Sequence, residues 1–269
     1  PGVPEHTYVS DIYASRHDAN VVYASFDNRK RDDFKPYLLK SNDKGKTWKS
    51  ITNGLPKNGT VHAIEQDFKN PNLIFAGTEF GIFFSNNGGE KWVQLKSGIP
   101  TTAGRVIGIQ EREEDLVLAT FGRGFYILDD YSPLRNINKE VTEKEAHMFG
   151  IPEAEMYVQK RGMYGQGSTY YTADNPTYGA VFTYYMKETP KTQEQLRHEK
   201  EKELFKDGKR IPQPTWKEQR DEEQEVSPYL VFTIYDEQGN VVRKMTKRPS
   251  QGIHRVAWDF RYENPYPVN

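Results

Sequence analysis

The sequence contains no cysteine, which excludes disulfide bonds, thiolate metal sites and cysteine nucleophiles. It also has little net charge, since a formal charge of −1 leaves no basic surface of the kind that binds nucleic acid. No apolar run approaches the length of a membrane span, so direct membrane insertion is not expected. The six histidines are scattered, and no phosphate-binding or G-x-S-x-G motif occurs. We therefore expect neither a metal nor a cofactor.

What the sequence does have is enough apolar material to fold. Its 269 residues are 35% hydrophobic and 13% aromatic, which suffices for one large domain or two ordinary ones. The opening stretch PGVPEHTYVS has neither an initiator methionine nor the layout of a signal peptide. We interpret the chain as an internal piece of a longer protein.

An internal repeat is the strongest pattern in the chain. The segment SNDKGKTW at residues 41–48 returns as SNNGGEKW at residues 85–92, a period of about 44 residues that is typical of propeller blades. Strand-length apolar runs at residues 21–24, 73–76 and 116–119 mark three copies of the unit. The repeat predicts an all-β fold that begins with a partial β-propeller, with four strands in each complete blade.

The repeated polar segment is expected to hold a hairpin connection together. An Asp or Asn side chain accepts backbone hydrogen bonds in a turn, Gly supplies a positive φ, and the closing Trp buries its ring. These structural positions are Ser41, Asp43, Gly45, Thr47 and Trp48 in the first copy, and Ser85, Asn87, Gly89 and Trp92 in the second. The alternative is a catalytic or calcium-binding Asp43, which the second copy weakens because an Asn stands at that position.

The first copy fits the Asp-box, or BNR repeat, in full, and the second fits it loosely. Asp-boxes occur in sialidases, in xyloglucan-cleaving propeller enzymes and in Vps10-domain receptors such as sortilin, where they lie at the blade periphery, away from the active centre. Longer stretches, among them RDDFKPYLLKSNDKGKTWKSITNGLP and GIHRVAWDFR, resemble the C-terminal part of bacterial exported proteins labelled Vps10/sortilin-like or glycosyl hydrolase. The resemblance implies a bacterial protein located outside the cytoplasm.

The third copy of the unit departs from the pattern, because LDDYSPLR replaces the expected Asp-box. We therefore expect the propeller to end there. Two full units and a partial one cannot close a ring, which needs at least about four blades. The remaining blades are expected as partners of this piece, supplied by sequence N-terminal to it.

After the third unit the sequence has mixed charge and no longer shows the repeat. We predict propeller blades over residues 1–132, a linker over 133–150, and an Ig-like β-sandwich over 151–269 in which DEQGN joins two strands. A charged segment at about 188–226 predicts a helical insertion. It is interpreted as a solvated helical hairpin, with a partner-binding arm as the alternative. Its expected anchors are Leu196, Leu204, Phe205 and Trp216.

Charged residues follow the second strand of each unit. Equivalent loops of successive blades converge on one face of a propeller, so Asp33, Glu79 and Arg123 are the weak candidates for catalysis. The further candidates in or near these loops are Asp27, Asp32, Asp129 and Asp130. We favour a binding or scaffold module that presents a face to a protein, peptide or glycan. The alternatives are a sialidase- or xyloglucanase-like glycoside hydrolase, or a piece that only completes a larger assembly.

Overall fold

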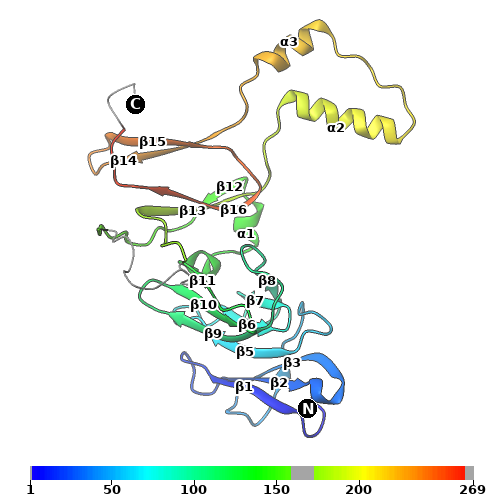
Figure 1. Ribbon diagram of the computed structural model, residues 1–269, viewed down its shortest axis with the longest axis vertical. Coiled ribbons are helices and arrows are strands. Elements are labelled where there is room, and N and C mark those ends of the chain that lie inside the picture. Colours follow the sequence, from blue (N-terminus) through cyan, green and yellow to red (C-terminus); the bar gives the residue numbers. More distant parts are fainter. Residues whose placement is uncertain (1, 159–172, 264–269) are drawn as a thin grey trace, which may run out of the picture. The chain divides into compact units, whose positions relative to one another are not determined.

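The computed structural model describes residues 2–158 and 173–263 of the chain (Figure 1). It divides into two compact units, Pro1–Asn138 and Lys139–Asn269. In the described part of the chain, no helix combines the length and the apolar character needed to cross a membrane. The protein is mostly β-structure with few helices.

Three antiparallel sheets make up the first unit, and we call them blades 1, 2 and 3 (Figure 1). Blade 1 contains β1 (Tyr8–Ala14), β2 (Val22–Asn28), β3 (Asp33–Ser41) and β4 (Lys49–Ser50), and a short helix, η1 (Arg29–Arg31), connects β2 to β3. Blade 2 contains β5 (Val61–Gln66), β6 (Ile74–Thr78), β7 (Gly81–Ser85) and β8 (Val93–Gln94). Blade 3 contains β9 (Gly104–Gln110), β10 (Asp115–Thr120) and β11 (Phe125–Leu128). Each blade runs strand to strand in chain order, which confirms the propeller-type fold.

The blades are stacked face to face, and blade 2 lies between the other two. Strand β5 lies against both β1 and β9, so the first strands of the three blades are neighbours. Apolar side chains from blades 1 and 2 form one core, which includes Tyr23, Leu38, Ile64, Phe83 and Trp92. Side chains from blades 2 and 3 form a second core, which includes Leu73, Phe75, Ile82, Leu116 and Leu118. Because both faces of blade 2 are covered, every residue of β6 and β7 is buried, and most of these residues are apolar.

The Asp-box residues hydrogen-bond to one another in the turn between β3 and β4. The Ser41 hydroxyl donates to Asp43 Oδ1 at 2.8 Å, and the Thr47 N–H and hydroxyl donate to the same carboxylate at 2.8 and 2.6 Å. These bonds, led by the one from the Thr47 side chain, lower the pKa of Asp43 to about 2. Gly45 has φ +83, which a non-glycine residue rarely adopts. Both carboxylate oxygens are therefore engaged within the turn.

The second copy makes two of these three bonds, with an amide in place of the carboxylate and Lys91 in place of Thr47. Asn87 Oδ1 accepts from the Ser85 hydroxyl at 2.7 Å and from the Lys91 N–H at 3.0 Å. The indole of Trp92 is 3% exposed and donates to the Ile51 carbonyl at 2.6 Å. Blade 2 is in this way hydrogen-bonded to blade 1 through its closing tryptophan.

Blade 3 has three strands within the described residues, and the chain then enters a short helix, η2 (Ser132–Arg135). The Tyr131 hydroxyl donates to Asp67 Oδ1 at 2.5 Å, and the Arg135 guanidinium donates to both oxygens of the same carboxylate at 2.7 and 2.9 Å. The segment that replaces an Asp-box therefore bonds back to the end of β5 in blade 2.

The second unit contains two small sheets. One sheet consists of β12 (Ala146–Met148), β13 (Ala180–Met186) and β16 (Gly252–Trp258), and the other of β14 (Leu230–Tyr235) and β15 (Val241–Lys247). Apolar side chains of the two sheets pack together, among them Tyr184, Val256, Phe232 and Met245. The predicted DEQGN hairpin is confirmed between β14 and β15. An Ig constant-type sandwich has about seven strands. The five strands in the described part leave the Ig-like sandwich a prediction.

Helices α1 (Lys139–Glu143), α2 (Gln193–Lys206) and α3 (Trp216–Gln224) also belong to this unit. Arg197 on α2 donates to both carboxylate oxygens of Glu222 on α3 at 2.7 and 2.8 Å. Leu196 and Leu204 line the hollow between these two helices. The prediction that Phe205 and Trp216 anchor the insertion is wrong, because they are 75% and 90% exposed. An ion pair between Arg197 and Glu222 joins the two helices.

Candidate functional site

Three hairpin turns at the same end of the blades form the candidate site, which we call the hairpin-tip face. They are residues 29–32 between β2 and β3, Glu79 and Phe80 between β6 and β7, and residues 121–124 between β10 and β11. Each turn follows the second strand of its blade, as the repeat requires.

An ion pair joins the first two turns. Arg29 Nη1 lies 2.7 Å from Glu79 Oε2, and the same guanidinium donates to Asp27 at 2.8 Å. Glu79 Oε2 also accepts a hydrogen bond from His62 Nε2 at 2.8 Å. The side chains of Arg29 and Glu79 are 27% and 34% exposed, so the pair lies at the border of the solvent.

His62 connects this pair to blade 3. Its Nδ1 lies 3.2 Å from Arg105 Nη1. A guanidinium only donates, so Nδ1 accepts and Nε2 carries the proton given to Glu79. Burial lowers the pKa of His62 below its usual value, and the positive charges of Arg105 and Arg29 act in the same direction. The imidazole is therefore neutral, and both its nitrogens are engaged.

Exposed aromatic side chains lie at the same hairpin turns. Phe34, Phe80 and Phe121 each lie at or beside a hairpin turn and are 44%, 38% and 72% exposed. The Arg105 guanidinium lies 5.3 Å from the centre of the Phe121 ring, in cation–π contact. The hairpin-tip face thus combines exposed rings with partly exposed charges of both signs.

The structure places the three sequence-predicted residues on these hairpins but does not bring them into one cluster. Only Glu79 takes part in the network. Asp33 accepts from the Tyr37 hydroxyl at 2.6 Å and from Asn28 at 3.1 Å, and the Tyr37 hydrogen bond leads the effects that lower its pKa. Arg123 makes no hydrogen bond or ion pair with any residue in the described ranges.

Three members of the network were not predicted from the sequence: Arg29, His62 and Arg105. One signal was present, because His62 and Arg105 stand at equivalent positions in the second and third repeats. Each is the second residue of its blade's first strand. Without its partners, a single histidine in an apolar strand such as β5 does not indicate a polar network.

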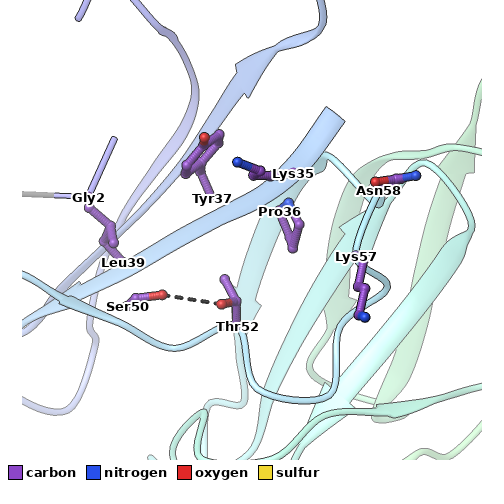
Figure 2. A pocket seen from close by; sticks show the side chains of 9 residues that line it. All are labelled: Gly2, Lys35, Pro36, Tyr37, Leu39, Ser50, Thr52, Lys57 and Asn58. Carbon is purple, nitrogen blue, oxygen red and sulfur yellow. Dashed lines mark hydrogen bonds between the residues drawn. The ribbon is translucent and has the colours of Figure 1, made fainter. Parts of the chain in front are cut away.

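A hollow of about 480 Å³ lies on blade 1, along β3 and beside the loop that leads to blade 2 (Figure 2). Figure 2 shows Lys35 and Tyr37 on one wall and Lys57 and Asn58 on the other, with Thr52 between them. No carboxylate lines it, so it has no acid–base pair of the kind that hydrolyses a glycoside. Among the residues that the structure describes, no group of side chains could hold a metal ion.

Comparisons with known proteins bear on the fold. No protein-family model matches the chain, and no curated protein sequence matches it. An ancestral GH74 enzyme is 26% identical over 43% of this chain and 14% of that chain, with a TM-score of 0.36. A GH74 xyloglucanase from Xanthomonas campestris is 12% identical over 45% of this chain and 21% of that chain, with a TM-score of 0.35.

A third similar structure is YCF48 bound to D1 peptide. It is 17% identical over 48% of this chain and 38% of that chain, with a TM-score of 0.35. The chain thus spans well under two thirds of the length of these three proteins. All three are β-propeller proteins, and the blades of this chain have the same type of fold.

Proposed function

We propose that the chain is a binding module whose hairpin-tip face receives a protein, peptide or glycan. The observation that carries this proposal is the arrangement of Phe34, Phe80 and Phe121, three exposed rings on three successive blades. Exposed aromatic rings next to charges are frequent anchors of binding surfaces, because they bury much area at a small entropic cost. A peptide and a glycan both offer surfaces that such rings can stack against.

The carboxylates of this face support binding over catalysis. Glu79 is held by Arg29 and His62, and Asp33 is held by Tyr37 and Asn28. A glycoside hydrolase needs a proton-donating carboxyl group with a raised pKa facing a second carboxylate across the sugar. An ion-paired carboxylate does not fill the role of the acid.

The test measures binding by the purified chain to a peptide library and to a glycan array. In the variant Phe121→Ser, the affinity for any ligand found should fall about tenfold or more, as expected for an aromatic anchor. The matched control is Phe205→Ser on α2, a ring that is 75% exposed but far along the chain from the face. Equal losses in the two variants, or no ligand in either screen, would contradict the proposal.

One observation favours hydrolysis as a second candidate. Burial raises the pKa of Asp115 at the start of β10, and the negative charges of Asp129, Glu113 and Asp130 add to the effect. A carboxyl group with a raised pKa beside ionised ones is the pattern of a general acid. Release of reducing sugar from xyloglucan or of sialic acid from sialosides, abolished in Asp115→Asn, would establish this activity in place of the binding role.

We also propose, on the sequence resemblance alone, that the protein works outside the cytoplasm of a bacterium as a Vps10/sortilin-like Asp-box protein. Fractionation of cells that express the full-length gene product tests the location. Recovery in the cytoplasmic fraction would contradict it.

A further inference from the structure

The two joins between blades are built in the same way. Alternate residues of a strand point to opposite faces of its sheet. In blade 2, Ile64 and Phe83 point toward blade 1, whereas Phe75 and Ile82 point toward blade 3. We call the face directed at the preceding blade in the chain the leading face, and the opposite one the trailing face. At each interface between blades, the leading face of one blade therefore packs against the trailing face of the blade before it.

Blade 1 has a leading face of the same construction. Ile12 pairs with Ala24, which pairs with Leu39, and in blade 2 Ile64 pairs with Ala76, which pairs with Phe83. Ile12 and Leu39 thus occupy the positions of Ile64 and Phe83. Trp48 likewise stands at the position of Trp92 in the repeated segment.

The difference between the two leading faces is burial. Ile64 and Trp92 are 2% and 3% exposed because blade 1 covers them. On blade 1, Ala24 and Leu39 are buried as well, but Ile12 on β1 is 65% exposed. Trp92 donates to the Ile51 carbonyl of blade 1, but the Trp48 indole has no hydrogen-bond partner among the residues described. The leading face of blade 2 is therefore buried, whereas that of blade 1 is open along β1.

The hollow of Figure 2 belongs to this open face. Lys35, Tyr37 and Leu39 alternate along β3, so they lie on the same face as Ile12. Ser50, which pairs with Leu39, lines the hollow as well. Gly2, which precedes β1, lines the hollow too, so the unit's own chain covers only part of this face.

At the other end of the stack, the trailing face of blade 3 is exposed. On blade 3, Val106 and Phe125 flank Ala119 across the sheet, in the register in which Ala63 and Ile82 flank Gly77 in blade 2. Ala63 and Ile82 are buried, whereas Val106 and Phe125 are 61% and 76% exposed. Among the residues that the structure describes, one leading and one trailing face thus keep exposed apolar side chains, as in a segment of a larger ring.

We propose that the leading face of blade 1 docks a further blade of the same repeat, contributed by polypeptide that precedes residue 1. The order of packing selects this occupant, because both leading faces that are covered receive the blade immediately before them in the chain. The incoming blade would offer a trailing face of the kind seen in blade 1, which presents Tyr23, Leu38 and Ile51 to blade 2. This inference does not depend on the ligand of the hairpin-tip face.

The absence of cysteine makes the test direct, since one introduced thiol is a unique reporter. Ile12→Cys and Ser50→Cys report on the open leading face, and Val241→Cys on β15, where the valine is 51% exposed, is the control. Each is labelled with a maleimide in this chain and in a polypeptide extended by the preceding residues of its gene, about one 44-residue repeat. Any cysteine in the extension is replaced by serine.

In the extended polypeptide, labelling of Ile12→Cys and Ser50→Cys should slow by about tenfold or more, because a docked blade must open first. Labelling of Val241→Cys should not change. Unchanged labelling of both reporters, or preceding residues without the repeat, would overturn the proposal. Labelling in the unextended chain that slows as its concentration rises would overturn it too, since a second copy would then be the occupant.

Discussion

The two ends of strand β5 carry polar networks that differ in how far they are closed off from water. At one end, Asp67 is fully buried and accepts hydrogen bonds from Tyr131 and Arg135. The Arg135 side chain is only 12% exposed. At the other end, His62 is buried, but its partner Glu79 and the Arg29 that pairs with Glu79 are 34% and 27% exposed. Both networks link blades, and only one of them reaches the solvent.

The contrast distinguishes a network that only holds the blades together from one that can also contact a ligand. The Asp67 network joins blade 2 to the segment after blade 3, and the ring of Tyr131 packs edge-on against Phe75 in the core at 5.3 Å. The His62 network is edged by the exposed ring of Phe121. A closed network can only stabilise the fold, whereas an open one next to exposed rings can also contact a ligand. This is why we place the binding site at the His62 end.

The largest effect is expected from Arg135→Ala. The substitution leaves the buried Asp67 carboxylate without its cation, and an uncompensated buried charge costs about 3–5 kcal/mol in the free energy of unfolding. Urea unfolding of the chain at neutral pH measures the loss. The control is Arg112→Ala, which removes an exposed ion pair with Glu113 and should cost less than about 1 kcal/mol. Equal losses in the two variants would show that the closed network does not fasten the blades.

A smaller effect is expected at the open end from Glu79→Ala. His62 Nε2 then loses its acceptor, and an unsatisfied buried donor costs about 1–3 kcal/mol. Glu79→Gln keeps an acceptor oxygen but loses the charge that Arg29 pairs with, so its loss in urea unfolding should be smaller. If Gln is as destabilising as Ala, the ion pair outweighs the hydrogen bond and the two ends are more alike than we infer.

The sequence predicted the features that recur along the chain. Apolar runs identified β2, β6 and β10, and the repeated polar segment identified the turns that follow β3 and β7. Those features are local, since each needs only residues within one repeat. The network around Arg135 could not be predicted in this way, because Asp67 lies 68 residues earlier and meets it only through the packing of two blades.

The candidate site was accessible from the sequence only in part. Convergence of equivalent loops led to the hairpin that bears Glu79, but the partners of that residue come from different blades. Arg29 lies at the end of β2, and His62 lies at the start of β5. Which partner a charge selects depends on side-chain reach across a blade interface, and a repeat pattern does not contain that information.

The smallest expected effect is a difference in how the two ends respond to acid. Burial lowers the pKa of His62 below its usual 6.5, so the unfolded chain takes up a proton first as the pH falls. The free energy of unfolding should therefore decrease below about pH 6.5, down to the pKa of the folded state. At the other end, burial disfavours the ionised form of Asp67. Hydrogen bonds from Arg135 and Tyr131 outweigh burial there and lower the pKa below 3.8.

Glu114 also pairs with Arg135 at the closed end, and its pKa is lowered from 4.5, so that end responds only at lower pH. Between about pH 6.5 and pH 5.5, then, only the His62 end should respond. The measurement compares urea unfolding of the protein with that of His62→Gln, whose amide can accept from Arg105 and donate to Glu79 without titrating. The parent should lose stability relative to this variant as the pH is lowered through the window, since its imidazole takes up a proton in the unfolded chain and resists one in the folded chain, where it faces two arginines. A constant difference between the two proteins would mean that His62 titrates alike in the folded and unfolded chains. The open end would then be as insensitive to acid in this range as the closed one, and burial of the imidazole would not set its charge.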